Sequence, residues 1–232
     1  MFDPSIGYDL YIINALGGNY TNLLFDSKIQ SLSAGSTEFV NAVKEKEGLL
    51  FMITARFRDL SNLGDCNNKN NTHKFGFYLS TKIISNKSNK SKSNDSLEFT
   101  ATDNKAFLFN CSGSTIYVHP VPEKSKENVI ELFDEREVRL LKIGNGDVML
   151  YKGRITNSCC PSKKTFDYCD SEFKKAETLM KDISKIKFDI ERLVVYQLGC
   201  DLNYTNYKTC SPSSMKNSKS NNDTKPGRYV SI

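Results

Sequence analysis

The sequence predicts an all-β protein, an antiparallel β-sandwich of the jelly-roll type with a short N-terminal helix and one inserted helix. Short runs rich in β-branched and aromatic residues recur along the chain, and Gly, Asn, Ser or Pro bounds each run. The runs do not alternate regularly with helices, as strands do in proteins with parallel sheets. Of the 232 residues, 38% are hydrophobic and 11% are aromatic, enough to build a sandwich core.

The first predicted element is a helix within residues 7–18, GYDLYIINALGG. Leu10, Ile13 and Leu16 recur at helical spacing and form an apolar stripe. The two glycines that follow end the helix, because glycine readily adopts the left-handed conformation found at helix C-termini.

A second helix is predicted over residues 171–186, with Asp170 or Ser171 as its capping residue. It interrupts the strand pattern, so we interpret it as an insertion. Its apolar face is expected to join the core and carries Phe173, Ala176, Met180 and Ile183.

Strands are predicted wherever apolar residues alternate between turn residues. Alternation breaks at Ile53 in the first of these segments, and it changes phase between Ile190 and Leu193 in the last. One segment splits in two at its Cys-Ser-Gly-Ser turn. The segments are 49–59, 74–84, 96–102, 106–121, 128–134 and 187–200.

The clearest hairpin is predicted over residues 137–154. A type I′ turn at Asn145-Gly146 is expected, because both residues tolerate the positive φ that this turn requires. One face is expected to carry Val138, Leu140 and Lys142 on the first strand, with Val148, Leu150 and Lys152 on the return strand.

The strands and helices group into one predicted sandwich domain over residues 1–204. Residues 85–96 are expected to be a disordered loop insertion, because they lack apolar side chains. Residues 205–232 have similar low complexity and are expected to be a linker that can lead to a further domain.

Cysteine usage indicates an oxidising compartment. The seven cysteines form no C-x-x-C pair and there are two histidines, which disfavours zinc. Scattered cysteines favour disulfides, and their odd number leaves one thiol over. The first residues show no secretory signal, so the chain is expected to be either cytosolic or a fragment. The cysteines favour a secreted protein or one on the extracellular face of the cell surface.

Glycosylation motifs agree with that compartment. Those in ordered-looking sequence start at Asn19, Asn110 and Asn203. No apolar run is long enough to span a membrane. The net charge of +5 comes mostly from dispersed lysines, which disfavours a nucleic-acid interface.

Several stretches, in order, resemble the thrombospondin N-terminal-like branch of the laminin G-like (concanavalin A-like) domains. They are Tyr8-Asp9-Leu10 with Ala15-Leu16-Gly17, FMITARFRD at 51–59, and the hairpin 137–154 with FDIERLVVYQLGC at 188–200. The resemblance covers residues 7–200. The sequence departs from the family because it has no tryptophan and because it carries the predicted helix over 171–186.

The resemblance implies that the first helix caps the open end of the sandwich. It also implies a disulfide between Cys200 and one of two adjacent cysteines, Cys159 or Cys160. The remaining cysteines are provisionally paired as Cys66 with Cys111 and Cys169 with Cys210.

The resemblance further implies an adhesion or ligand-binding role, because some members bind heparin or other sulfated glycans. Partners would be glycans or cell-surface proteins, together with other domains of the same chain. The glycan-binding residues would lie on or beside the inserted helix, and they are Lys163, Lys164, Lys174, Lys181 and Lys185.

The alternatives are a solvated helix face on a structural spacer domain, and a divergent jelly-roll enzyme acting on carbohydrates. The enzyme would use carboxylates from the cluster Glu131, Asp134, Glu135 and Glu137. We expect no enzyme, with His73 solvated and His119 structural. We also expect no cofactor, although Asp103 and Asp147 are conceivable Ca²⁺ ligands.

Overall fold

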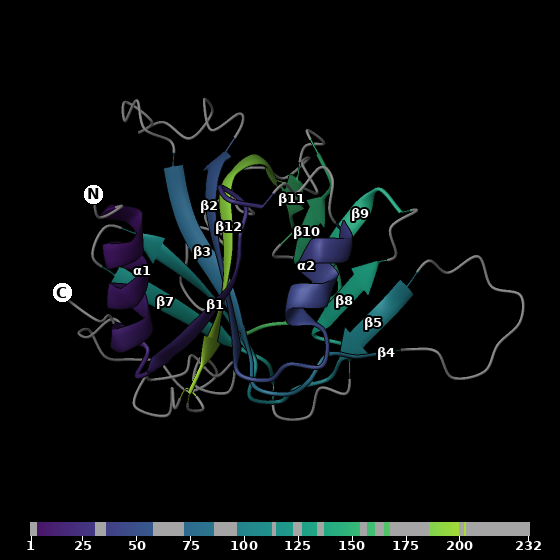
Figure 1. Cartoon of the computed structure of the whole chain (residues 1–232), viewed down its shortest axis with the longest axis horizontal. Helices are drawn as coiled ribbons and strands as arrows, with labels where there is room; N and C mark the ends of the chain where they lie inside the picture. The colour runs from purple at the N-terminus through teal and green to yellow at the C-terminus, as the bar shows by residue number, and fades with distance from the viewer. Residues whose placement is uncertain are drawn as a thin grey trace, which may run out of the picture.

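The chain folds as an antiparallel β-sandwich with an N-terminal helix, as predicted (Figure 1). The computed structural model describes residues 4–30, 36–57, 72–85, 97–112, 115–122, 127–133, 137–153, 157–160, 165–167, 186–199 and 202. Neither helix in these ranges has the length and apolar character needed to cross a membrane.

The described elements are two helices and twelve strands. The helices are α1 (Pro4–Ala15) and α2 (Ser36–Val43). The strands are β1 (Tyr20–Asp26), β2 (Leu49–Phe57), β3 (Thr72–Leu79), β4 (Ile84–Ser85), β5 (Leu97–Ala101), β6 (Phe107–Ser112), β7 (Thr115–Pro120), β8 (Ile130–Phe133), β9 (Arg139–Ile143), β10 (Val148–Tyr151), β11 (Asn157–Cys159) and β12 (Ile186–Leu198).

All described strands belong to one hydrogen-bonded sheet that folds over on itself. Its order is β4-β5-β8-β9-β10-β11-β12-β2-β3-β6-β7, and β1 also pairs with β12. Figure 1 shows two facing layers. We call β1, β2, β3, β6, β7 and the later part of β12 the front layer, and β4, β5, β8, β9, β10 and β11 the back layer.

Strand β12 joins the two layers because its neighbour on one edge changes along its length. Near its start Phe188 pairs with Asn157 of β11, and further on Val194 pairs with Asp26 of β1. A bulge between Ile190 and Arg192 separates these two parts. This irregularity confirms the phase change that the sequence predicts, because an extra residue reverses which side chains face inward.

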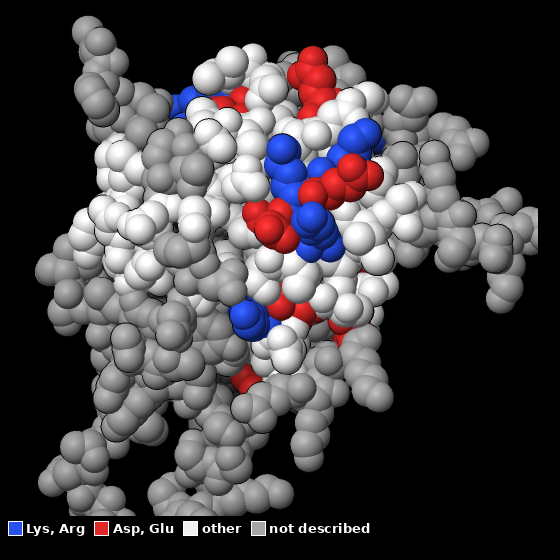
Figure 2. Space-filling model, turned by 60° about the horizontal axis from the view of Figure 1, so that its bottom comes forward, with Lys and Arg blue, Asp and Glu red and all other residues white. Residues whose placement is uncertain are grey.

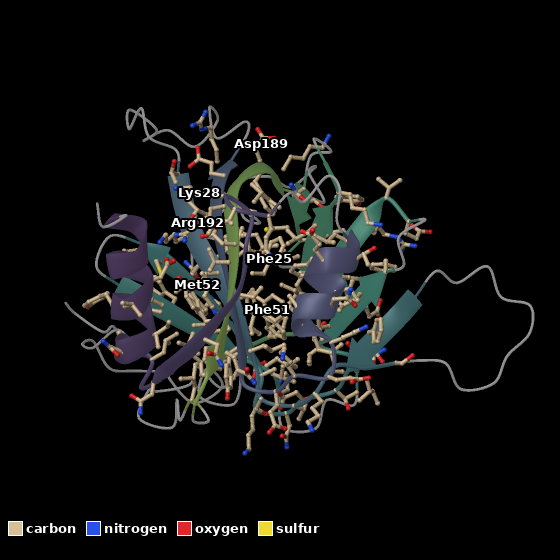
Figure 3. All side chains as sticks on the ribbon, viewed as in Figure 1. Phe25, Lys28, Phe51, Met52, Asp189 and Arg192 are labelled. Carbon is tan, nitrogen blue, oxygen red and sulfur yellow. The ribbon has the colours of Figure 1, made fainter. Side chains whose placement is uncertain are left out.

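Two separate apolar clusters hold the layers and helices together. The larger lies between the layers and includes Phe25, Phe51 and Phe77. The smaller lies between α1 and the outer face of the front layer, where Ile12 and Ile13 of α1 join sheet residues such as Met52. Figure 3 shows side chains, among them Phe25 and Phe51, occupying the space between the layers.

The predicted break at Ile53 is wrong, because β2 alternates regularly. Leu49, Phe51 and Ile53 face the core between the layers, while Leu50 and Met52 face α1. Both faces are buried, so both carry apolar residues and the alternation is hidden in the sequence.

The prediction that α1 caps the open end of the sandwich is also wrong. The helix covers the outer face of the front layer, with Ile13 and Leu16 of its predicted stripe fully buried and Leu10 partly buried (Figure 1). That face needs a cover because its side chains are apolar.

Helix α2, which the sequence analysis missed, contributes instead to the core between the layers. The ring of Phe39 lies 5.2 Å from that of Phe25 and 6.4 Å from that of Phe51. The spacing of Phe39, Val40 and Val43 is a helical pattern that could have revealed this helix.

The end of α1 confirms the predicted glycine cap. Gly17 has φ of 78°. Its N–H donates to the carbonyl of Asn14, and the N–H of Gly18 donates to the carbonyl of Ile13, both at 2.9 Å. These two bonds form a Schellman motif, which satisfies carbonyls at the helix end.

The predicted hairpin is confirmed as β9 and β10, but its turn differs. Ile143 pairs with Val148, so four residues connect the strands. The positive φ values belong to Gly144 and Gly146, not to Asn145, which excludes the predicted type I′ turn at Asn145-Gly146. Leu141 and Leu150 form an inward-facing pair, whereas Val138 is exposed.

Several predictions fall outside the described residues. They concern the helix over 171–186, of which only Ile186 is described as the first residue of β12, the insertion after Ser85 and the segment 205–232.

Glycine at position 76 is required because neighbouring atoms fill the place that a side chain on β3 would take. A Cβ atom there would lie 2.2 Å from the carbonyl oxygen of Phe51 and 2.4 Å from the ring of Phe109. We therefore expect Gly76→Ala to lower the free energy of unfolding by about 1–3 kcal/mol, measured by urea denaturation. Gly7→Ala in α1 is the control, since nothing lies within 4 Å of its added carbon, and it should not destabilise the chain.

Candidate functional site

The predicted glycan-binding lysines Lys163, Lys164, Lys174, Lys181 and Lys185 all lie outside the described residues. The segment that carries them connects β11 to β12. Cys159 at the end of β11 pairs with Ile186 at the start of β12, so both ends of the segment meet at neighbouring strands.

The two conceivable calcium ligands, Asp103 and Asp147, both take part in hydrogen bonds within the fold. The carboxylate of Asp103 accepts hydrogen bonds from the backbone N–H groups of Ser80 and Lys105, at 2.6 and 2.9 Å, and so ties two loops together. Asp147 is buried, and its carbonyl accepts the N–H of Cys160 at 2.7 Å. Within the described ranges, no three His, Cys, Asp or Glu side chains are grouped to hold a metal ion.

Two of the carboxylates considered for the enzymatic alternative form ion pairs on the back layer. Glu131 lies 2.6 Å from Lys142, and Glu137 lies 3.2 Å from Arg139. The guanidinium of Arg139 also covers the ring of Phe133 at 4.2 Å. Asp134 and Glu135 lie outside the described residues.

Histidines occupy different environments. His119 is buried and shares a 2.7 Å hydrogen bond with the side-chain oxygen of Asn110, which supports its expected structural role. His73 is half-buried in β3, so its expected solvation is only partial.

Two expected disulfides are not formed. Cys111 and Cys159 are free thiols, which excludes the pairing of Cys111 with Cys66 and of Cys159 with Cys200. Cys159 lies inside the core between the layers, where burial raises the pKa of its thiol. The sequence could not show that both cysteines are buried on strands, Cys159 between the layers and Cys111 beneath α1. Cys160 forms no disulfide either, which excludes its alternative pairing with Cys200. Cys169 and Cys210 lie outside the described residues, so their pairing stays a prediction.

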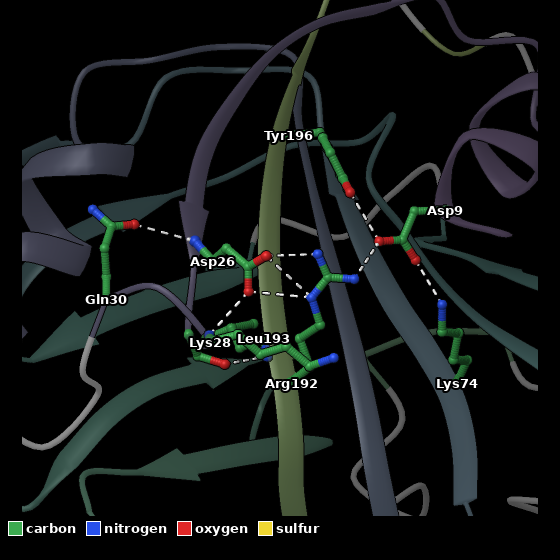
Figure 4. A network of polar contacts seen from close by, with 9 residues as sticks. Asp9, Asp26, Lys28, Gln30, Lys74, Arg192, Leu193 and Tyr196 are labelled. Atoms are coloured by element: carbon green, nitrogen blue, oxygen red, sulfur yellow. Dashed lines mark hydrogen bonds and ion pairs between the residues drawn. The ribbon is translucent and has the colours of Figure 1, made fainter. Parts of the chain in front are cut away.

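The most distinctive polar cluster is an ionic network beneath α1 (Figure 4). Its centre is the guanidinium of Arg192 on β12, whose side chain is only 3% exposed. Arg192 donates to Asp26 at the end of β1, with the shortest contact 2.6 Å from Nη2, and to Asp9 of α1 at 3.1 Å from Nη1. One cation therefore bridges two elements from the N-terminal part of the chain.

Asp9 has two further partners on the sheet. The hydroxyl of Tyr196 donates to Asp9 Oδ2 at 2.8 Å, and Lys74 Nζ of β3 lies 2.6 Å from Oδ1. Lys74 Nζ also lies 4.6 Å from the ring centre of Tyr8. These contacts place Asp9 over two strands at once.

Hydrogen bonds within the turn after β1 also hold Asp26 in place. Its carboxylate accepts the N–H of Lys28 at 3.0 Å, and its own N–H donates to the side chain of Gln30 at 3.2 Å. The next residue, Ser27, accepts the N–H of Leu193 through its hydroxyl at 2.9 Å. The turn after β1 is thus hydrogen-bonded to the part of β12 that follows the bulge.

The network shifts the pKa values of its members in the directions that stabilise the charged pair. Burial alone would raise the pKa of Asp26, but the hydrogen bonds from Arg192 and Lys28 outweigh it and lower that pKa. The hydrogen bonds to Asp26 raise the pKa of Arg192. Burial and the nearby charge of Asp9 raise the pKa of Tyr196, so its hydroxyl stays protonated and donates.

Cys111 lies at the edge of this network, beneath Tyr8. Burial raises the pKa of its thiol to about 12, although Lys74 acts in the opposite direction. A neutral buried thiol is a poor nucleophile. With two carboxylates and two cations in mutual contact, the network is suited to holding α1 and β1 on the sheet.

No sequence motif singles out the residues of this network. Asp9 and Arg192 were visible as charged residues inside apolar stretches, which is the one signal that could have found them. Their pairing was not visible, because 183 positions separate the two residues in the sequence.

The chain matches no family model, and no curated protein matches its sequence.

Acid should weaken the fold through Asp26. The pKa of Asp26 in the folded protein lies below its unfolded value of about 3.9. The stabilisation that the ionised Asp26 provides is therefore fully present above about pH 3.9, and it is lost as the pH falls through the folded-state pKa. Asp26→Asn should lower stability at pH 7 by about 3–5 kcal/mol, because Arg192 loses its main partner, and should flatten the acid limb. Urea denaturation between pH 2 and 7 measures both effects, with the exposed Glu47→Gln as control. An unchanged acid limb in Asp26→Asn would contradict the assignment.

Only one of the two described glycosylation motifs is accessible. Asn19 is exposed, whereas Asn110 is 4% exposed on β6 and its side-chain oxygen is bonded to His119. In a host that adds N-glycans, glycopeptide mapping should find a glycan at Asn19 and none at Asn110. The burial of Asn110 argues against the expected glycan there, and finding one would show that β6 is open when the glycan is added.

Proposed function

We propose that this chain is an extracellular adhesion or ligand-binding module of the laminin G-like kind, which binds sulfated glycans through a lysine-rich insertion. The insertion is residues 160–185, and its proposed contact residues are Lys163, Lys164, Lys174, Lys181 and Lys185. The supporting observation is that both ends of the insertion are fixed at one place, by the pairing of Cys159 with Ile186.

Two more contacts anchor the insertion near its start. The N–H of Cys160 donates to the carbonyl of Asp147, and the hydroxyl of Thr165 accepts the N–H of Asn145 at 2.6 Å. Cys160 and Thr165, on either side of Lys163 and Lys164, are therefore both hydrogen-bonded to the turn between β9 and β10. Lysines concentrated at a fixed site attract a polyanion more strongly than dispersed ones.

The described charged residues on the face drawn in Figure 2 are mixed in sign. Figure 2 shows Lys and Arg interleaved with Asp and Glu over one face. Arg56 lies 2.6 Å from Glu191, and Lys142 and Arg139 also have carboxylate neighbours. Neighbouring carboxylates weaken the attraction of these three cations for a sulfated chain.

Heparin-affinity chromatography with a salt gradient tests the proposal. Replacing the five insertion lysines by Gln should shift elution to clearly lower salt, because fewer sulfate contacts remain. The matched control replaces five lysines elsewhere by Gln, at Lys28, Lys44, Lys46, Lys82 and Lys105. Both variants lose five charges, so the control should elute close to the parent.

Equal losses in the two variants would show attraction by net charge alone and would overturn the assignment to the insertion. A parent chain that passes through the column at low salt would overturn glycan binding itself.

A further inference from the structure

We propose that α1 is a releasable cover, which opens as a unit from the outer face of the front layer while the two layers stay folded. This inference does not depend on glycan binding. It rests on how α1 is held, on the separation of the two apolar clusters and on the weakness of α1 as an isolated helix.

Helix α1 has little stability of its own. It has 12 residues, no acidic residue in its first turn and no basic residue in its last turn, so its dipole lacks favourable end charges. Gly7 lies within it, and isolated helices of this length are marginal in water. The helix therefore persists because it is docked, and undocking and melting should coincide.

Docking depends on an apolar underside and one carboxylate. Ile12, Ile13 and Leu16 pack against the sheet. The titratable and charged groups that face Asp9 are Lys74 of β3, Cys111 of β6, and Arg192 and Tyr196 of β12, with Asp26 of β1 on the far side of Arg192. Removing the charge of Asp9 leaves buried cations undercompensated, which favours the open state.

The body does not need α1 for its own core. The cluster between the layers contains no residue of α1, and the bond from Arg192 to Asp26 joins β12 to β1 without an atom of the helix. The helix ends in the Gly17-Gly18 cap, a short glycine connection to β1. Local opening of such a unit is expected when its contacts are separate from those of the rest of the protein.

Two buried thiols report on the two clusters separately. Cys111 is 7% exposed and lies beneath Tyr8, so it becomes reactive when α1 lifts. Cys159 is 0% exposed between the layers, so it becomes reactive when the body opens. Both can be followed in one sample by timed N-ethylmaleimide labelling and peptide mass spectrometry.

In the parent chain, Cys111 should be labelled faster than Cys159. Asp9→Asn should accelerate labelling of Cys111 by about 100-fold or more, because a buried ion pair is broken, and should leave the rate at Cys159 within about two-fold. Ile13→Ala is a second variant that weakens docking without touching the network, and it should act in the same direction. Glu38→Gln, an exposed acid on α2, is the control and should change neither rate.

Equal acceleration of Cys111 and Cys159 in either α1 variant would mean that α1 opens only with the whole protein, and would overturn the proposal. An unchanged Cys111 rate in both variants would overturn it as well. Should Asp9→Asn fail to fold, the Ile13→Ala rates decide between the same outcomes.

Discussion

Arg192 carries its charge in a place that water scarcely reaches, and the position of the N-terminal segment follows from that constraint. Removing a guanidinium from water is unfavourable by several kcal/mol unless carboxylates and hydrogen bonds replace the solvent. Asp26 and Asp9 supply them, one from the end of β1 and one from α1. Any register of β1 or rotation of α1 that separated these groups would leave a buried charge unpaired. The network thus selects one arrangement from the many that apolar packing alone would tolerate.

A second constraint comes from the front layer, whose central strands are buried on both faces. Leu49 and Leu50, adjacent in sequence, belong to different apolar clusters, one between the layers and one beneath α1. An antiparallel sheet commonly leaves one face to solvent, and such a sheet needs no outer helix. Here the outer face of β2, β3, β6 and β12 requires a cover, and α1 provides it. The location of α1 is therefore a consequence of the composition of four strands far from it in sequence.

Local features of the chain were predictable and long-range ones were not. The glycine cap at Gly17, the hairpin of β9 and β10 and the bulge near Arg192 each depend on a few consecutive residues, so spacing and turn chemistry predict them. Helix α2 was missed although Phe39, Val40 and Val43 have helical spacing, because its pattern is short. The position of α1, the free thiols Cys111 and Cys159 and the pairing of Asp9 with Arg192 depend on which strands become neighbours. That information lies in contacts between distant positions, which no window of sequence contains.

Strand β12 has a consequence for how this chain is made. It is the only described strand that pairs with both layers, and it comes last among the described strands. During translation, Asp26 emerges from the ribosome long before Val194, the residue it faces across the sheet. The nascent chain must therefore keep its early strands and the apolar side of its first helix from aggregating until more than 160 further residues have been added. High contact order of this kind predicts slow folding, with the sheet closed only after its last described strand is synthesised.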